Sequence, residues 1–323
     1  MTRDRRGKVL GGRYALRDLA GEGGMATVWR ARDLDPAGGG RTVAVKRVLA
    51  ERGADASLMR LFEEEARVGQ SLHHPSIVEI HDFGTDEDGD YYLVMEWVEG
   101  LDLHQWAASF PAGVRPTPWP LAVAIGVEVL RGLDAAHRRV GEDGIAAPVF
   151  HRDVSPSNVL LGSNGAVKVT DFGLARAMDR SSMTRSNTVK GKLAYCAPEL
   201  IYGSRPSPRS DLFAASVVLW EVLAQERLFT GQNDIEVLLA VRQGHVPPLT
   251  ELRQDVPRTL VDTLETGLAS APEDRFASAS LMAQALSAVL RAHAEPVGPE
   301  HIGQSVLEAR RYFGLPDRSS QAP

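Results

Sequence analysis

Three polar side chains in one short stretch of the chain have the types and the spacing that phosphoryl transfer requires. Asp153 is followed by Asn158 and then by Asp171. Phosphoryl transfer needs a carboxylate beside the attacking hydroxyl and side-chain oxygens that hold Mg²⁺ against the nucleotide phosphates. Two carboxylates and one amide would supply these groups if the fold brought them together.

The residues between Asn158 and Asp171 predict how they are brought together. The run VLLGSNGAVKVT has β-branched and apolar residues on both sides of a GSNG cluster at 162–165. Such a cluster between two short apolar runs favours a β-hairpin. A hairpin would return Asp171 to the place where Asn158 lies.

Four motifs in a fixed order connect this stretch to a known family. The chain contains HRD at 151–153, Asn158 five residues after the Asp, DFG at 171–173 and APE at 197–199. From about Tyr14 to about Ala292 it resembles the eukaryotic-like protein kinases, most closely the bacterial serine/threonine branch. The resemblance implies a bilobal α+β fold, with a small antiparallel β-sheet N-lobe carrying one helix and a mainly α-helical C-lobe.

The resemblance also implies the domain organisation. We expect a flexible N-terminal segment at 1–13, a kinase domain at 14–293 and a C-terminal tail at 294–323 with one short helix. Within the domain, the N-lobe would span 14–98 and the C-lobe 99–293.

A glycine-rich turn between two strands would cover the nucleotide phosphates. Glycines there let the backbone approach phosphate oxygens and present N–H groups to them. Lys46, in the strand pattern VAVK, would pair with the phosphates and with Glu65, the member of three consecutive acids that fits the family pattern best. The turn residues expected at the nucleotide are Ala20, Gly21, Glu22, Gly23, Gly24 and Met25.

The family pattern also implies an adenine site. An apolar slot with a few polar contacts at its rim is typical of such sites. Met95 would be the gatekeeper, and Glu96 C=O and Val98 N–H would meet the adenine edge. The apolar side chains expected to enclose the ring are Val28, Ala44 and Leu160.

By the same resemblance, Asp153 is the catalytic base, and Asn158 and Asp171 bind the metal. ATP is the expected phosphate donor with Mg²⁺ as the metal and Mn²⁺ as a substitute. His151 and Phe172 would pack in the hydrophobic spine. Arg152 is typical of relatives that are controlled by phosphorylation of the activation segment, because its guanidinium can pair with a phosphate.

Two positions depart from the family pattern. Ser155 stands where serine/threonine members have a Lys, and Ser157 does not replace it; Lys192 stands where a Thr is expected. Our hypothesis is that Lys192 reaches back and supplies the cation that position 155 lacks, so that it acts as a catalytic residue. The alternative is that Lys192 is a solvated loop residue and that the enzyme is slow or inactive.

The segment from Asp171 to Glu199 and the helices after it complete the expectations. Thr184 and Thr188 are the predicted autophosphorylation positions. Asp211 would hold the backbone of the catalytic loop, and Glu199 would pair with Arg275. Cys196, the single cysteine, is interpreted as a free buried thiol.

Composition limits the partners. The chain has 36 basic and 42 acidic residues, a net charge of −6 and no long basic run, which argues against nucleic acid or an anionic membrane as a partner. One Cys excludes an internal disulfide and fits a reducing compartment. No signal peptide or apolar span is apparent. We therefore expect a cytoplasmic protein without membrane insertion, acting on protein substrates and on itself.

Three functions remain open from the sequence. The first is an active serine/threonine protein kinase that relays a signal. The second is a pseudokinase that binds nucleotide and acts as a scaffold, which Ser155 and Lys192 support. The third is a kinase for a small molecule, which the APE segment with its partners Asp211 and Arg275 disfavours.

Overall fold

The computed structural model describes most of the chain as two compact units. The first unit holds the described residues up to His73 together with Val78–Val98, and the second holds His74–Ile77, Glu99–Phe172 and the described residues from Lys192 onward. The described residues are 6–22, 26–36, 40–48, 63–64, 66–87, 89–172, 192–293 and 296–315.

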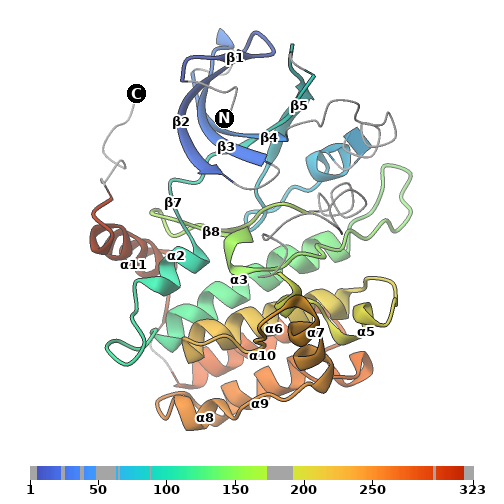
Figure 1. Cartoon of the computed structure of the whole chain (residues 1–323), viewed down its shortest axis with the longest axis vertical. Helices are drawn as coiled ribbons and strands as arrows, with labels where there is room; N and C mark the ends of the chain where they lie inside the picture. Colours follow the sequence, from blue (N-terminus) through green and yellow to red (C-terminus); the bar gives the residue numbers. More distant parts are fainter. Residues whose placement is uncertain are drawn as a thin grey trace. The chain divides into compact units, whose positions relative to one another are not determined.

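The first unit is built on one curled antiparallel sheet (Figure 1) with the strand order β1-β2-β3-β4-β6-β5. This sheet and the helical residues 63–64 and 66–70 confirm the expected small β-lobe. The strands are β1 (Val9–Leu10), β2 (Tyr14–Glu22), β3 (Ala26–Asp33), β4 (Thr42–Val48), β5 (Ile80–Thr85) and β6 (Tyr91–Glu96).

Alternation along β4 separates a core face from a second face. Val43 and Val45 are fully buried, and the register pairs Val45 with Trp29 on β3 and with Val94 on β6. Successive side chains of a strand point to opposite faces. Ala44 and Lys46 therefore lie on the opposite face. The core itself also includes Leu10, Tyr14, Leu16, Ala31 and Tyr92.

Two strand expectations need correction. The N-terminal segment 1–13 was expected to be flexible, but Val9 and Leu10 pair with β2, and Leu10 is buried in the core. The sequence predicts a strand over 77–83, but β5 begins at Ile80. Ile77 instead bridges Val169 and belongs to the second unit. The bridge of Ile77 is a long-range contact that a local pattern does not record. The strand β1, by contrast, pairs with β2 across a short turn.

The second unit is mainly helical, as expected. The sequence predicts a short helix over 103–108, which α2 matches. It also predicts a non-helical loop over 111–120 because of four prolines, but α3 begins inside that stretch. Pro120 is accommodated because a proline in the first helical turn breaks no helix hydrogen bond. The helices are α2 (Leu103–Ala108), α3 (Trp119–His137), α5 (Pro198–Ile201), α6 (Pro208–Ala224), α7 (Asp234–Gln243), α8 (Leu249–Leu252), α9 (Arg258–Gly267), α10 (Ala279–His293) and α11 (Pro299–Tyr312), with short 3₁₀ turns η2 (Pro156–Asn158), η3 (Leu193–Tyr195) and η4 (Pro272–Asp274).

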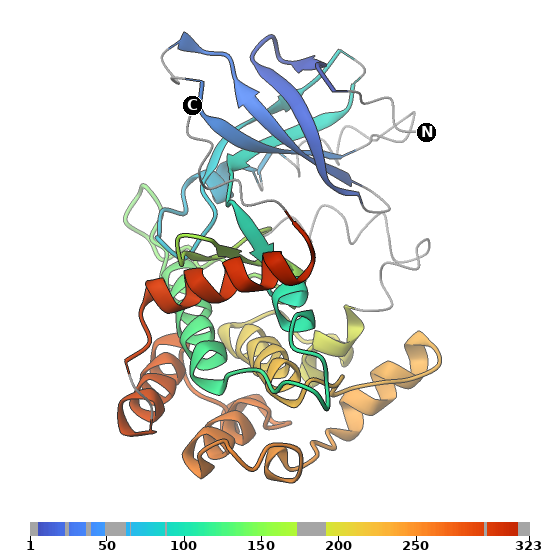
Figure 2. The same ribbon diagram turned by 90° about the vertical axis from the view of Figure 1, so that its left-hand side faces the viewer.

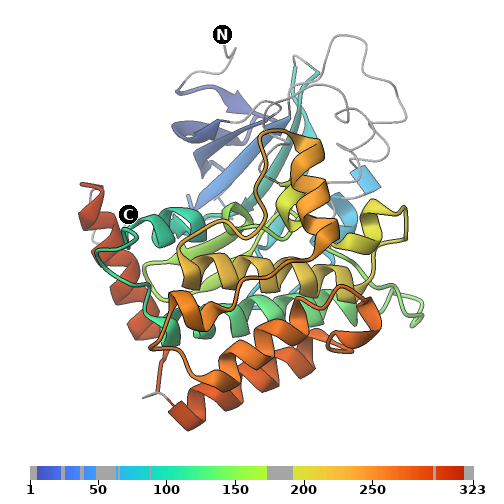
Figure 3. The same ribbon diagram turned by 60° about the horizontal axis from the view of Figure 1, so that its bottom comes forward.

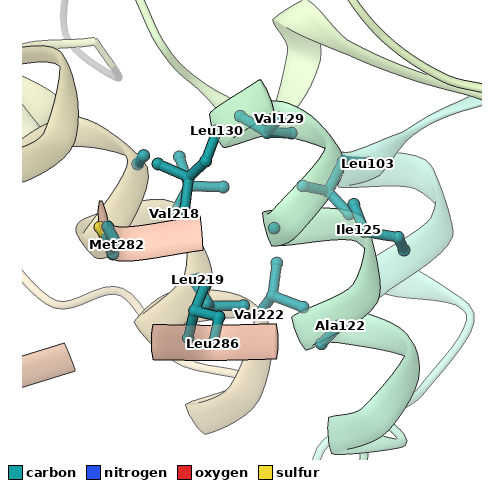
Figure 4. Close-up of a pocket in the computed structure, with 12 residues that line it drawn as sticks. Leu103, Ala122, Ile125, Val129, Leu130, Val218, Leu219, Val222, Met282 and Leu286 are labelled. Atoms are coloured by element: carbon teal, nitrogen blue, oxygen red, sulfur yellow. The ribbon is translucent and has the colours of Figure 1, made fainter. Parts of the chain in front are cut away.

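The core of the second unit lies between α3, α6 and α10, which pack side by side (Figure 3). Nearly every residue of α6 is buried, so this helix forms the centre of the unit. A cavity of about 20 Å³ remains between these helices and α2 (Figure 4). Its lining is apolar, so it is a packing gap rather than a ligand site. No helix in the described residues is both long and apolar enough to span a membrane.

A buried ion pair ties α5 to the base of this unit. Arg275 Nη1 and Nη2 donate to the two carboxylate oxygens of Glu199 at 2.9 and 2.8 Å, and the side chain of Arg275 is fully buried. The same guanidinium donates to the carbonyls of Ala269, Ser270 and Arg209. The predicted pair between Glu199 and Arg275 is therefore confirmed. It attaches the APE motif to the helical core of this unit.

We expect Glu199→Ala to lower the free energy of unfolding by about 3 kcal/mol, because it leaves a buried guanidinium without its carboxylate. Urea unfolding followed by circular dichroism measures this. Asp262→Ala is the matched control, because it breaks an exposed pair with Arg258 and should cost at most about 1 kcal/mol. Equal losses in the two variants would contradict the assignment.

Candidate active site

A three-stranded sheet carries the predicted metal-binding residues. Strands β7 (Gly100–Asp102), β8 (Val159–Gly162) and β9 (Val167–Val169) are antiparallel, and Val159 pairs with Val169. Past this pair, Thr170 N–H donates to Asn158 C=O at 3.0 Å. The predicted hairpin is therefore confirmed. Asn158 and Asp171 both lie next to its open end, opposite the turn.

The loop before β8 places Asp153 beside Asn158. The Asn158 Nδ2 group donates to the backbone carbonyl of Asp153 at 2.7 Å and to its carboxylate oxygen Oδ2 at 2.9 Å. Asn158 is buried, and the side chain of Asp153 is partly exposed. The predicted base is thus held in place by a predicted metal ligand.

Asp211 holds the backbone of this loop from below. Its Oδ2 accepts the His151 N–H at 2.8 Å, and its Oδ1 accepts the Arg152 N–H at 2.9 Å. His137 Nε2 lies 2.8 Å from Oδ2. The predicted anchoring role of Asp211 is confirmed by these contacts. The part of His137 was not predicted, because nothing in its sequence neighbourhood separates it from other histidines near helix ends.

Two non-glycine residues of the site have left-handed backbone conformations, Arg152 with φ of 67° and Asp171 with φ of 65°. Such conformations cost of order 1–3 kcal/mol unless the surroundings impose them, and they concentrate at functional sites. The bonds from Asp211 impose the first. The strain falls directly beside Asp153 and on a predicted metal ligand.

His151 is a structural residue in this loop. Its Nδ1 accepts the Asp153 N–H at 3.2 Å, and its Nε2 lies 2.8 Å from Thr170 C=O. These two partners require a neutral imidazole that carries its proton on Nε2. Its ring centroid lies 4.6 Å from that of Phe172. The predicted packing of His151 with Phe172 is therefore confirmed.

Lys192 contacts Asp153. Its Nζ donates to Asp153 Oδ2, the oxygen that Asn158 also contacts. Lys192 lies just before η3, and its side chain is about half exposed. Because the described side-chain donors to Asp153 converge on Oδ2, Oδ1 is the oxygen left for a substrate hydroxyl. The structure thus places a cation at the base; its catalytic role stays a prediction.

Ser155 and Ser157 add no charge to the site. Their hydroxyl oxygens lie 3.3 Å apart, and Ser155 is buried.

Arg152 is exposed and has no ion pair with an acid among the described residues. Its guanidinium is therefore accessible from solvent.

The donor set at the hairpin end fits Mg²⁺. Mg²⁺ prefers oxygen ligands, and carboxylate and amide oxygens are its usual protein ligands. The amide nitrogen of Asn158 donates to Asp153, so the amide oxygen Oδ1 is the atom left to contact a cation. Asp171 brings a carboxylate at the same end of the hairpin.

Four predicted nucleotide-binding residues share one face of the first unit's sheet. The register pairs Val28 with Lys46 and Ala44 with Met95. Because cross-strand partners and alternate residues share a face, these four side chains lie together opposite the core face. Beyond β6, which ends at Glu96, Val98 is outside the ladder. The sheet thus presents one face that fits the predicted adenine and phosphate contacts.

The remaining predicted residues are placed as follows. Ala20, Gly21 and Glu22 form the exposed end of β2. Leu160, half-exposed on β8, belongs to the second unit. Outside the described residues lie Gly23, Gly24, Met25, Glu65, Thr184 and Thr188.

One polar cluster after Lys192 was not predicted. Tyr195 OH donates to Glu221 Oε2 at 2.7 Å, and Arg227 contacts both groups. Burial, with the nearby Glu221 carboxylate, raises the pKa of the Tyr195 hydroxyl, which stays protonated as a donor. Cys196, expected to be buried, is half-exposed. The cluster fixes η3, and no sequence motif signalled it.

Comparison with known proteins agrees with this geometry. The protein kinase domain family matches residues 14–287. The chain is 38% identical over 292 residues to the tyrosine-protein kinase MasK of Myxococcus xanthus, 33% over 279 residues to the serine/threonine-protein kinase PrkC of Bacillus subtilis, and 35% over 301 residues to the serine/threonine-protein kinase PknA of Mycobacterium tuberculosis. These alignments cover 90%, 85% and 91% of this chain but only 45%, 40% and 64% of the relatives.

A solved structure shows the same fold. The kinase domain of Mycobacterium tuberculosis PknI aligns with a TM-score of 0.66 and 28% sequence identity. The alignment covers 88% of this chain and 99% of that domain. Since the family match spans most of the sequence, the chain belongs to the protein kinase family.

Proposed function

We propose that this protein is a serine/threonine protein kinase that transfers the γ-phosphate of ATP to protein hydroxyls, including its own. The observation that carries the proposal is that Asn158 and Lys192 both contact the carboxylate of Asp153. Asp171 leaves the same end of the hairpin as Asn158. A base, an amide ligand, a carboxylate ligand and a cation are the groups that phosphoryl transfer uses.

Asp153 and Lys192 have different proposed roles in the transfer. Asp153 Oδ1 would accept a hydrogen bond from the substrate hydroxyl and orient its oxygen toward the phosphate. Lys192 would offset negative charge that develops at the transferred phosphoryl group, in place of the Lys missing at position 155. Preorganised charges of this kind are commonly the largest contribution to catalysis.

Asn158 and Asp171 are the residues that would hold Mg²⁺. The ion would bridge phosphate oxygens and neutralise their charge. In the first unit, Lys46 would pair with the phosphates, and Val28, Ala44 and Met95 would form one wall of the adenine slot. These assignments rest on the shared sheet face and on membership of the family.

The class of hydroxyl is part of the proposal. PrkC and PknA are named serine/threonine kinases, whereas MasK is named a tyrosine kinase. We favour serine and threonine because the motifs resemble that bacterial branch most closely. Tyrosine is the second candidate, and the name of MasK is the observation that favours it.

We further propose that the enzyme works in the cytoplasm as part of a signalling pathway. The basis is the composition of the chain and the single Cys. The pseudokinase reading finds no support in the comparisons, since these relatives are named as kinases.

The proposal predicts transfer from labelled ATP with Mg²⁺ to the protein itself and to a generic basic substrate. Asp153→Asn should abolish transfer while it preserves ATP binding, because the amide keeps the shape of the side chain but cannot act as a base. Phosphoamino acid analysis of the wild-type product identifies the hydroxyl class. A wild type that binds ATP and transfers nothing would refute the proposal.

Lys192→Ala should lower kcat about a hundredfold, since one transition-state electrostatic contact is worth on the order of 3 kcal/mol. Ser155→Lys in the same variant should restore a large part of that loss, because it returns a cation to the usual family position. Arg205→Ala, which removes a charge from an exposed position, is the control. An unchanged rate in Lys192→Ala would contradict the role of Lys192.

Autophosphorylation should modify Thr184 or Thr188, because exposed Arg152 offers a guanidinium for a phosphate on that segment. Mass spectrometry after incubation with Mg-ATP locates the modification. An Asp153→Asn sample is the control for phosphate acquired during expression. A segment that remains unmodified in the active wild type would count against this form of control.

A further inference from the structure

Helix α11 lies outside the part of the chain that matches the family, yet it packs on the catalytic hairpin. The family match ends at residue 287, and α11 spans Pro299–Tyr312. The helix contacts β7, β8, α2 and α3. Figure 2 shows it, in red, lying across β7 and α2. The sequence predicted one short helix in this tail, but not the surface that it covers.

The first turns of α11 meet the hairpin turn at two glycines. A Cβ atom on Gly303 would lie 2.6 Å from the carbonyl oxygen of Ser163 and 2.9 Å from the amide nitrogen of Gly165. A Cβ atom on Gly165 would overlap the Pro299 carbonyl. Backbone therefore packs directly on backbone, and neither side has room for a side chain. A contact this close allows little independent movement of the turn.

The last turn of α11 holds the strand on the other side of the hairpin. Arg310, only 7% exposed, donates from NH1 to Gly100 C=O at 3.0 Å and pairs through NH2 with Glu99 at 3.0 Å. Glu99 C=O in turn accepts the Ser163 N–H at 2.8 Å. Helix, strand and turn are thus joined in a closed set of contacts.

The middle of the helix makes the third attachment. Ser305 Oγ accepts the indole N–H of Trp106 at 2.9 Å, and both residues are buried. Trp106 lies on α2, which packs against η2, and Asn158 is the last residue of η2. The buried face of the helix is completed by Ile302, Val306 and Ala309.

We propose that α11 is a brace that positions the metal-binding end of the hairpin, with Gly303 and Arg310 as positioning residues. This inference rests on the proposed kinase function. The helix fixes the turn, and β8 extends from it by about 13 Å at 3.3 Å per residue to Asn158. A sheet of three short strands needs packing against other elements to be stable. The geometry at Asn158 and Asp171 therefore depends on the support at the turn.

Point substitutions in the full chain test the brace. Gly303→Ala forces the helix away from the turn, and Arg310→Ala removes the attachment to β7. Their matched controls are Gln304→Ala and Arg311→Ala, which alter exposed residues of the same helix. Arg311→Ala removes the same charge as Arg310→Ala, so charge alone cannot explain a difference between them.

Two measurements distinguish positioning from a general loss of stability. Hydrogen–deuterium exchange of the peptide covering 159–171 should be several-fold faster in Gly303→Ala and Arg310→Ala than in the controls. The Mg²⁺ concentration for half-maximal phosphate transfer, and for half-maximal ADP binding, should rise about tenfold, as is typical when the support of metal ligands is removed.

The outcomes separate the brace from the proposed function. Unchanged exchange at 159–171 in both variants would overturn the brace. A lower melting temperature with an unchanged Mg²⁺ requirement would also overturn it, because α11 would then only add stability. If the wild type transfers no phosphate, the proposed function fails, but exchange and Mg²⁺-dependent ADP binding still decide whether α11 positions the hairpin.

Discussion

One buried carboxylate sets the shape of the catalytic loop. Asp211 is 1% exposed and accepts two backbone N–H groups, from His151 and Arg152, while His137 Nε2 contacts its Oδ2. An ionised carboxylate buried without partners would cost several kcal/mol. The carboxylate and the loop therefore stabilise each other, and the left-handed backbone of Arg152 is part of that arrangement. Asp153 follows directly, so its position depends on a residue of the helical core.

The hairpin that begins after this loop is held at both ends. At its open end, Asn158 is tied to Asp153 and, through its carbonyl, to Thr170. At its turn, the backbone is packed against Gly303. A short strand pair has few bonds of its own, so contacts from elsewhere in the chain must fix its geometry. On the brace proposal, helix α11 therefore contributes to the geometry of the catalytic site, although it lies after the family match.

Local pattern was sufficient for the elements but not for their long-range contacts. The GSNG turn and the flanking apolar runs predicted the hairpin, and the pattern VAVK predicted the strand that carries Lys46. Nothing local predicted that Ile77 would pair with Val169, because this contact joins segments far apart in sequence. The cluster of Tyr195, Glu221 and Arg227 was missed for the same reason. Resemblance to the family supplied the roles of Asp211 and Glu199, which periodicity could not.

Because Ser155 replaces the usual Lys and Lys192 replaces the usual Thr, the position of the cation depends on a different segment of the chain. A Lys at position 155 would belong to the same short loop as Asp153, and its place would follow from that loop alone. Lys192 instead stands at the start of η3, which Tyr195 attaches to Glu221 on α6. If Lys192 supplies the catalytic cation, the charge is present at Asp153 only while this segment holds its position. Any movement of η3 would then remove the cation from the base without disturbing Asp153, Asn158 or the hairpin. A factor that moves η3 would therefore also determine whether the Lys192 ammonium is present beside Asp153.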